Sequence, residues 1–285
     1  MPIEQLSFHH KDLLRERLKN VQTSLSEYSF ANLFLFRGMH HYEVLSEKNE
    51  IFIIGTMRDG RRYVMPTLDP RLGDNSLLFK LSKNYDCIFP IAEEWLDIFD
   101  ADRFTRSYHD DDSDYIYTVD QLSTYKGQKL HGQKNLLNQF FLKYTPNPQP
   151  LTKECMPDGR TILNDWQIQS GENKEATDYY PCLDALEKYD ELVLCGGIYY
   201  VDQEPAGFMI GEEINEKMFL VHFAKGLKKF KGIYQYMYNQ FAKILPNKYI
   251  FMNFEQDMGK TVLKAAKLSY HPDQILKKYR IQRIS

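Results

Sequence analysis

The turn at residues 225–232 combines lysine and glycine in a way that suits an anion. It follows the apolar segment 218–224, which we predict to be a strand, and precedes the amphipathic segment 233–245, which we predict to be a helix. The first turn of a helix exposes unpaired backbone N–H groups and partial positive charge. Gly232 would let a ligand approach the backbone closely. A solvated basic turn beside an ordinary core helix is the alternative. The candidate anion-binding residues here are Lys229, Lys231, Gly232 and Ile233.

Acidic residues follow the next predicted strand, at residues 248–254. Glu255 and Asp257 stand at its carboxyl end, where ligands bind in open α/β sheets. Their carboxylates could hold an amine or relay a proton, or they could simply favour the dipole of the helix that follows. His222 is a candidate base, although a lone histidine in a strand is more often structural. Tyr270 is a candidate general acid, one of 20 tyrosines.

Two other patches resemble metal sites, and we expect neither to bind a metal. The segment HDDDSD (109–114) spaces its aspartates as a calcium loop does, but Tyr115 and Gln121 stand where that loop needs glycine and glutamate. The pairs His9-His10 and His40-His41 have no partner at ligand spacing. The four cysteines are widely scattered and lack zinc-ligand spacing: Cys87, Cys155, Cys182 and Cys195.

Charge is distributed unevenly along the chain. Residues 217–285 contain fourteen Lys and Arg against three acidic residues, a formal charge of +11, whereas the whole chain is −3. This asymmetry indicates an anionic partner for the C-terminal part. No apolar run approaches the roughly 20 residues of a membrane span, and the N-terminus lacks the apolar core of a signal peptide. We therefore expect a cytoplasmic protein.

The predicted elements repeat one order. Each half shows a helix, three antiparallel strands, a helix, a strand, a helix and a final strand. This is the order of the GCN5-related N-acetyltransferase fold. We therefore predict an α/β (α+β) protein of tandem acetyltransferase-like domains with mixed, mainly antiparallel sheets. A helix from about Lys129 to Tyr144 connects the halves, and the prolines of TPNPQP end it. The expected domains are residues 1–146 and 147–285.

Several motifs together resemble a known bacterial family. They are YIYTVDQLSTYKGQKLHGQKNLLNQF, WQIQ, ELVLCGGIYYV, FKGIYQYMYNQFA and FEQDMGKTVLKAAKLSYHP. Between about Ser26 and Tyr279 the chain resembles proteins that share a domain with the C-terminal region of phosphatidylglycerol lysyltransferases. The resemblance implies tandem acetyltransferase folds related to the aminoacyl-tRNA-dependent peptidyl transferases of cell-wall synthesis. It also implies transfer of an aminoacyl group from charged tRNA to a lipid hydroxyl.

The resemblance carries over residue by residue. His222 and Lys225 match in the strand, but Ala224 stands at a commonly acidic position, and Lys264 stands where arginine is more usual. The remaining matching positions are Lys129, His131, Lys134, Asn135, Asn138, Asn253, Glu255, Gln256, Asp257, Gly259, Lys267, Ser269 and Tyr270. The resemblance therefore adds five residues to the candidate donor-binding set: Lys129, Lys134, Asn135, Lys264 and Lys267.

Three functions remain open on the sequence. The first is an acyl- or aminoacyltransferase that takes its donor, an aminoacyl-tRNA, in the second domain. The second is an acetyl-CoA-dependent N-acetyltransferase. The third is a non-catalytic module that binds RNA or anionic lipid. In each case the partner is anionic, and a peripheral contact with anionic lipid is compatible with the same charge.

Overall fold

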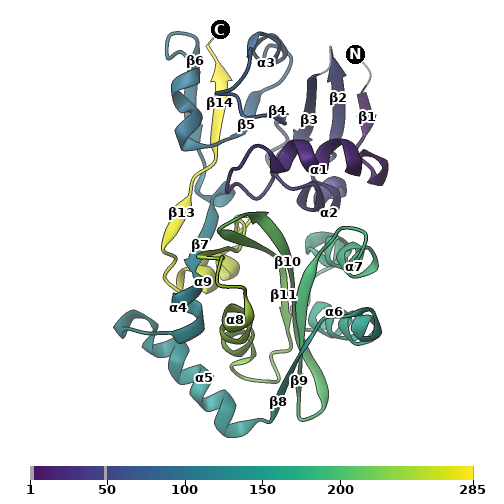
Figure 1. Ribbon diagram of the computed structural model, residues 1–285, viewed down its shortest axis with the longest axis vertical. Helices are drawn as coiled ribbons and strands as arrows, with labels where there is room; N and C mark the ends of the chain where they lie inside the picture. Colours follow the sequence, from purple (N-terminus) through teal and green to yellow (C-terminus); the bar gives the residue numbers. More distant parts are fainter. Residues whose placement is uncertain (1–2, 48–49, 285) are drawn as a thin grey trace. The chain divides into compact units, whose positions relative to one another are not determined.

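The computed structural model describes residues 3–47 and 50–284 and divides the chain into two compact units (Figure 1). Unit 1 comprises Met1–Asp114, Gln256–Lys260 and Ile275–Ser285, and unit 2 comprises Tyr115–Glu255 and Thr261–Gln274. The chain therefore enters and leaves each unit more than once, whereas the expected domains, residues 1–146 and 147–285, imply a single crossing.

Unit 1 is built on a seven-stranded, mainly antiparallel sheet with the strand order β1-β2-β3-β4-β5-β14-β6. The step from β4 to β5 is parallel. The strands are β1 (Ile3–Gln5), β2 (Glu43–Glu47), β3 (Glu50–Thr56), β4 (Arg62–Pro66), β5 (Cys87–Ile91), β6 (Phe104–Tyr108) and β14 (Tyr279–Arg283). The helices are α1 (Lys11–Lys19), α2 (Phe30–His40) and α3 (Ser76–Leu81), with 3-10 turns η1 (Phe8–His10), η2 (Glu93–Ile98) and η3 (Asp110–Asp112).

Unit 2 holds most of a second seven-stranded sheet, with the order β13-β7-β12-β11-β10-β9-β8. Here the step from β11 to β12 is parallel. The strands are β7 (Asp114–Thr118), β8 (Pro146–Pro150), β9 (Cys195–Val201), β10 (Glu204–Asn215), β11 (Met218–Gly226), β12 (Phe251–Asn253) and β13 (Gln274–Leu276). The helices are α4 (Val119–Thr124), α5 (His131–Lys143), α6 (Met156–Ser170), α7 (Tyr179–Glu187), α8 (Ile233–Ile244) and α9 (Thr261–Leu268), with 3-10 turns η4 (Gln128–Leu130), η5 (Lys153–Cys155) and η6 (Lys174–Ala176).

Each sheet thus contains a three-stranded antiparallel meander followed by a parallel step. The meander is β2-β3-β4 in unit 1 and β9-β10-β11 in unit 2. This confirms the predicted fold class, a mixed α/β protein with two mainly antiparallel sheets. The final predicted strand exists as β14, and it pairs with β5 and β6 in the sheet of unit 1.

Helices cover both faces of the meander in unit 2. α6 and α7 lie on one face of β9–β11, and α8 lies on the other (Figure 1). β11 is consequently buried along most of its length and reads as a nearly continuous apolar run, MFLVHFA. His222 within this run and Lys225 directly after it are buried polar groups that need an explanation.

Helices α1 and α2 end where they do for local reasons. The first ends at Lys19, and Gln22 has a φ of 53°, so the apolar pattern up to residue 27 continues in an irregular segment. The second passes through Gly38 and ends at His40, because His41 takes the left-handed conformation that closes a helix.

Candidate active site

The parallel strands β11 and β12 pair over only three residues. Met218–Leu220 pairs with Phe251–Asn253, and β11 then continues to Gly226 without β12 beside it. Polar groups of unit 2 gather just beyond this point. The candidate site is therefore built where the two strands stop pairing.

His222 is the extra residue of a β-bulge. Phe223 pairs with Ile210 and Val221 pairs with Gly211, so His222 has no partner residue on β10. A bulge re-aims a side chain, and bulges are frequent beside active sites. The imidazole is fully buried, with Nδ1 2.8 Å from Oε1 of Glu255 and Nε2 3.0 Å from Oε1 of Glu212. Two carboxylates, one from within β10 and one from just after β12, thus hold one ring.

This arrangement makes His222 a cation at neutral pH. Burial lowers the pKa of an imidazole, but the hydrogen bonds to Glu212 and Glu255 outweigh it and raise the pKa of His222 to about 9. The three groups carry a formal charge of −1 when both carboxylates are ionised. A ring that already holds its proton is a poor base, so the geometry favours a carboxylate as the proton acceptor.

Glu212 was not identified from the sequence. It follows the apolar residues FMIG of β10 and precedes the exposed Glu213, and its own side chain is 16% exposed. Its position opposite a histidine depends on the register and on the bulge, which the sequence does not reveal. An acidic residue inside an apolar strand was the available signal.

The backbone at Glu255 is constrained into an uncommon conformation. Its φ is 56°, a value that costs a residue with a side chain about 1–3 kcal/mol. The Oδ1 atom of Asn253 accepts the Glu255 N–H at 2.7 Å, and the Glu255 carbonyl accepts the Tyr115 N–H at 3.2 Å. The Nζ of Lys267 donates to the carbonyls of Phe254 and Glu255 at 2.6 and 3.0 Å. Lys267, a predicted donor-binding residue, therefore serves at least to fix the loop that carries Glu255.

Asp257 forms part of the turn after this loop. Its Oδ1 accepts the Gly259 N–H at 2.8 Å, and its carbonyl accepts the Lys260 N–H at 3.1 Å. Asp257 is fully buried and belongs to unit 1. These contacts give it a turn-forming role, while Glu255 is grouped with His222 in unit 2.

Tyr270 lies in a cluster of aromatic rings in unit 2. Its ring centroid is 5.1 Å from that of Tyr238 and 6.1 and 6.4 Å from those of Tyr125 and Tyr117. Burial raises the pKa of Tyr270 well above its ordinary value. Its hydroxyl is buried and has no hydrogen-bond partner among the described residues. A buried hydroxyl without a partner is uncommon and needs an explanation, such as a ligand or water.

The turn before α8 is covered by α5. Gly232 has a φ of 94°, and a Cβ placed on it would lie 2.8 Å from the carbonyl oxygen of Leu136 and 3.1 Å from Phe140. The glycine is therefore required by the close approach of α5 and by its own backbone. Ile233 is buried, whereas Lys229 and Lys231 remain exposed, and Lys229 forms an ion pair with Glu204.

The connecting segment presents polar side chains to solvent. Lys129, Lys134 and Asn135 are exposed, and the last two lie on α5 within a turn of Leu136. Lys264, on α9, is partly exposed.

Part of the predicted positive charge is internal. Lys225 is buried, with Nζ 2.6 Å from Asp178 and 3.4 Å from the ring centroid of Trp166. In unit 1, Lys278 is fully buried, with Nζ 2.6 Å from Asp114 and 2.7 Å from Glu27. The charge of +11 thus overstates the charge that residues 217–285 offer to a partner.

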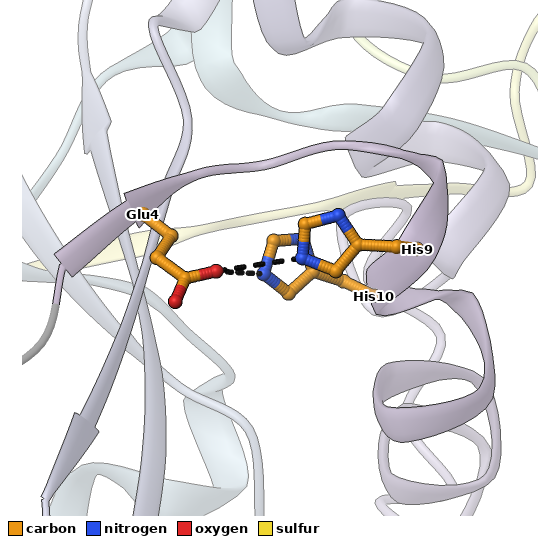
Figure 2. A group of neighbouring side chains, drawn as sticks. All are labelled: Glu4, His9 and His10. Carbon is orange, nitrogen blue, oxygen red and sulfur yellow. Dashed lines mark ion pairs between the residues drawn. The ribbon is translucent and has the colours of Figure 1, made fainter.

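One histidine pair has a partner that the sequence did not reveal. Glu4 lies beside both His9 and His10, so the expectation that this pair lacks a ligand partner is wrong (Figure 2). By contrast, Nδ1 of His40 lies 3.1 Å from the carbonyl oxygen of Thr56.

Comparison with known proteins places the chain in a family. Residues 18–282 match the model described as phosphatidylglycerol lysyltransferase, C-terminal. A conserved protein of unknown function from Bacteroides thetaiotaomicron superposes with a TM-score of 0.86 at 24% identity, covering 100% of both chains. The C-terminal domain of an Agrobacterium fabrum protein provisionally described as a lysylphosphatidylglycerol synthetase superposes with a TM-score of 0.63 at 13% identity, covering 96% of this chain and 92% of that one.

A curated relative matches a smaller part of the chain. An uncharacterized protein of Mycoplasmoides gallisepticum is 23% identical over 182 residues, which are 61% of this chain and 57% of the relative's length. Among the helices of residues 3–47 and 50–284, none combines the length and apolar character needed to cross a bilayer. With a family match over residues 18–282, the chain belongs to the phosphatidylglycerol lysyltransferase C-terminal family.

Proposed function

We propose that the chain is an acyltransferase whose donor is an aminoacyl-tRNA and whose site in unit 2 is formed around Glu212, His222 and Glu255. The observation that carries the proposal is the imidazolium held between two carboxylates at a bulge, where the parallel strands stop pairing. Family membership supports the same reaction class. The acceptor is a hydroxyl or an amine, and a lipid hydroxyl is the acceptor that the family resemblance suggests.

The charge of the site suits an aminoacyl group. An aminoacyl ester carries an ammonium group, and a site with a formal charge of −1 attracts it. His222 keeps both carboxylates fixed, because each carboxylate accepts a hydrogen bond from one N–H group of the ring. The geometry would thus position the amine of the donor while the ester carbonyl remains open to attack.

The transfer needs one proton acceptor and one proton donor. The acceptor hydroxyl or amine would lose its proton to Glu255 as its oxygen or nitrogen bonds to the carbonyl carbon. The ester C–O bond then breaks, and the leaving ribose oxygen takes up a proton. We assign that donation to Tyr270, whose hydroxyl has no hydrogen-bond partner among the described residues and keeps its proton at neutral pH. A proton would then pass through solvent from Glu255 to the Tyr270 phenolate and restore both groups. Lys267 would act as a positioning residue, through the main chain of Glu255.

The donor's phosphates would meet exposed side chains rather than the backbone of the glycine turn. α5 already occupies the space beside Gly232, which argues against a pyrophosphate in close contact with that residue. This disfavours the acetyl-CoA alternative. The proposed phosphate contacts come from exposed or partly exposed residues: Lys129, Lys134, Asn135, Lys231 and Lys264, with Lys229 if its pair with Glu204 opens.

The described residues of unit 1 do not form a second donor site of this kind. The helix in the corresponding place, α3, has only six residues. Asp74 caps its start by accepting the Ser76 N–H at 2.8 Å, and Asp69 lies in the same loop. The exposed carboxylate of Asp74 would repel phosphate, whereas Asp69 is already paired with Arg71 at 2.6 Å. We therefore expect one donor per chain.

A binding experiment separates the candidate donors. Charged tRNA and acetyl-CoA would each be titrated into the wild-type chain and into the double variant Lys129→Ala/Lys134→Ala at several salt concentrations. A tRNA donor predicts tight binding that weakens with salt and a smaller salt slope in the variant. The control is Lys153→Ala. Lys153 is an exposed lysine on η5, and its replacement should change only the net charge of the protein. Binding of acetyl-CoA but not tRNA would contradict the proposal.

A further inference from the structure

Three metal-ligating side chains converge near the N-terminus of unit 1. Oε2 of Glu4 lies 3.4 Å from Nε2 of His9 and 3.6 Å from Nε2 of His10 (Figure 2). The two rings lie against each other, with centroids 3.8 Å apart and an interplanar angle of 35°. Glu4 comes from β1 and the histidines from η1, so a short loop brings the three donors together.

The spacing of these donors suits a small divalent ion. Zinc binds histidine nitrogen and carboxylate oxygen at about 2.0–2.2 Å, and a tetrahedral arrangement of such bonds separates neighbouring donors by about 3.3–3.6 Å. The distances from Glu4 fall at this value without any movement of the side chains. A cavity of about 250 Å³ adjoins the donors and leaves room for a water ligand.

We propose that Glu4, His9 and His10 form a binding site for a divalent transition-metal ion of the zinc type. Two imidazoles and one carboxylate suit Zn²⁺ better than Ca²⁺ or Mg²⁺, which prefer oxygen ligands alone. The site has three protein ligands and an open fourth position. Such an ion exchanges with solution, because Glu4 and His9 are largely exposed.

Ser7 orients both rings. Its Oγ lies 2.7 Å from Nδ1 of His9, an outer contact of the kind that fixes a metal-binding imidazole. Its N–H donates to Nδ1 of His10 at 3.2 Å, so the neutral His10 ring carries its proton on Nε2. Binding of the ion at Nε2 of His10 therefore requires the ring proton to move to Nδ1, which breaks the contact with the Ser7 N–H. That step makes His10 the costliest of the three ligands, and His9 and Glu4 the primary ones.

The ion would hold an edge strand in place. β1 has three residues, all exposed, and among the described strands its partner is β2 alone. A bond from Glu4 to the histidines of η1 would close the loop between β1 and α1. Because the ion binds the folded state, it should stabilise the protein in proportion to its concentration.

The test is a Zn²⁺ titration of the full chain followed by calorimetry and thermal unfolding. The background variant Cys155→Ser/Cys195→Ser removes the two accessible thiols, which could bind zinc elsewhere. We expect one ion per chain and a rise in Tm. Glu4→Gln and His9→Gln should each weaken binding by about tenfold or more, since the loss of even an outer contact costs about 10–100-fold.

The matched control is His109→Gln. His109 is exposed and lies 3.5 Å from Asp111, so it represents an ordinary histidine–carboxylate pair. This variant should bind zinc as the background does. The proposal is overturned if zinc does not bind, or if Glu4→Gln and His9→Gln bind as tightly as the control. Both residues are exposed, so these variants remain informative even if replacement of the buried His10 disturbs folding.

Discussion

Oε1 of Glu255 lies 2.8 Å from Nδ1 of His222, although the two residues are 33 positions apart in the sequence. His222 stands in a β-bulge, and Glu255 has a left-handed backbone conformation. Neither residue is therefore in a regular strand conformation. Their ion pair closes the gap that opens where β11 and β12 stop pairing. It accounts for a buried charge in an apolar strand and defines the proposed site.

Replacement of His222 should destabilise the protein strongly. His222→Gln removes the cation and leaves two carboxylates with low exposure near one another. Breaking a buried ion pair by removing one partner costs about 3–5 kcal/mol of unfolding free energy. Urea unfolding at pH 7 measures the loss. His131→Gln on exposed α5 is the control and should change the free energy by no more than about 0.5 kcal/mol.

The stability of the wild-type chain should fall in mildly alkaline solution. The folded state raises the pKa of His222 from 6.5 to about 9, so folding favours the protonated ring. The resulting stabilisation is present in full below pH 6.5 and is lost as the pH rises through about 9. It amounts to about 3 kcal/mol at about 1.4 kcal/mol for each pKa unit. Urea unfolding from pH 6 to 10 should show this slope in the wild type and a smaller slope in His222→Gln; equal slopes would contradict the charge state assigned to His222.

The sequence predicted the antiparallel meanders and the helix and strand that follow each of them, because these depend on local patterns. Apolar alternation and turn residues mark β9, β10 and β11, and glycine marks the start of α8. It could not predict that β14 would pair with β5 and β6, because an apolar strand contains no information about which sheet it joins.

The candidate site was predicted only in part for the same reason. Glu255 and His222 stood out by type and position, but their pairing with Glu212 depends on a one-residue bulge. The lysines were predicted as one basic surface, because burial cannot be read from composition. Lys278 is one of the fourteen basic residues counted in the charge of residues 217–285, yet its side chain is fully buried.

Lys278 should therefore be far more important for stability than its neighbour Lys277. Lys278→Met would leave Glu27 and Asp114 buried without their cation, at a cost of about 3–5 kcal/mol. Lys277 lies near solvent, with Nζ 4.3 Å from the ring centroid of Tyr108, so Lys277→Met should cost no more than about 1 kcal/mol. Thermal and urea unfolding of the two variants would measure the difference, and equal effects would rule out the buried network.

Gly232 should resist replacement because of α5. Gly232→Ala would place a Cβ 2.8 Å from the Leu136 carbonyl oxygen in a backbone with a φ of 94°, so we expect a loss of at least about 1–3 kcal/mol. Gly132→Ala is the matched control on α5 itself. Apart from the adjacent backbone of α5, no described atom lies within 4 Å of a Cβ there, and alanine favours a helix by about 0.5–1 kcal/mol. Urea unfolding measures the loss. If Gly232→Ala had the same unfolding midpoint as the wild type, α5 would not pack on this turn.

The central claim is that Glu255 takes part in acyl transfer from a charged tRNA. The most direct measurement is single-turnover loss of the aminoacyl group from labelled aminoacyl-tRNA in the presence of phosphatidylglycerol vesicles, with the wild type, Glu255→Gln and the exposed control Glu216→Gln. We expect the wild type and the control to transfer the group to the lipid, and Glu255→Gln to be slower by about 10²–10⁴-fold while tRNA binding is retained. Transfer by Glu255→Gln at the wild-type rate would contradict the account, as would a folded wild-type chain that binds tRNA but moves no aminoacyl group to lipid, hydroxyl or amine acceptors.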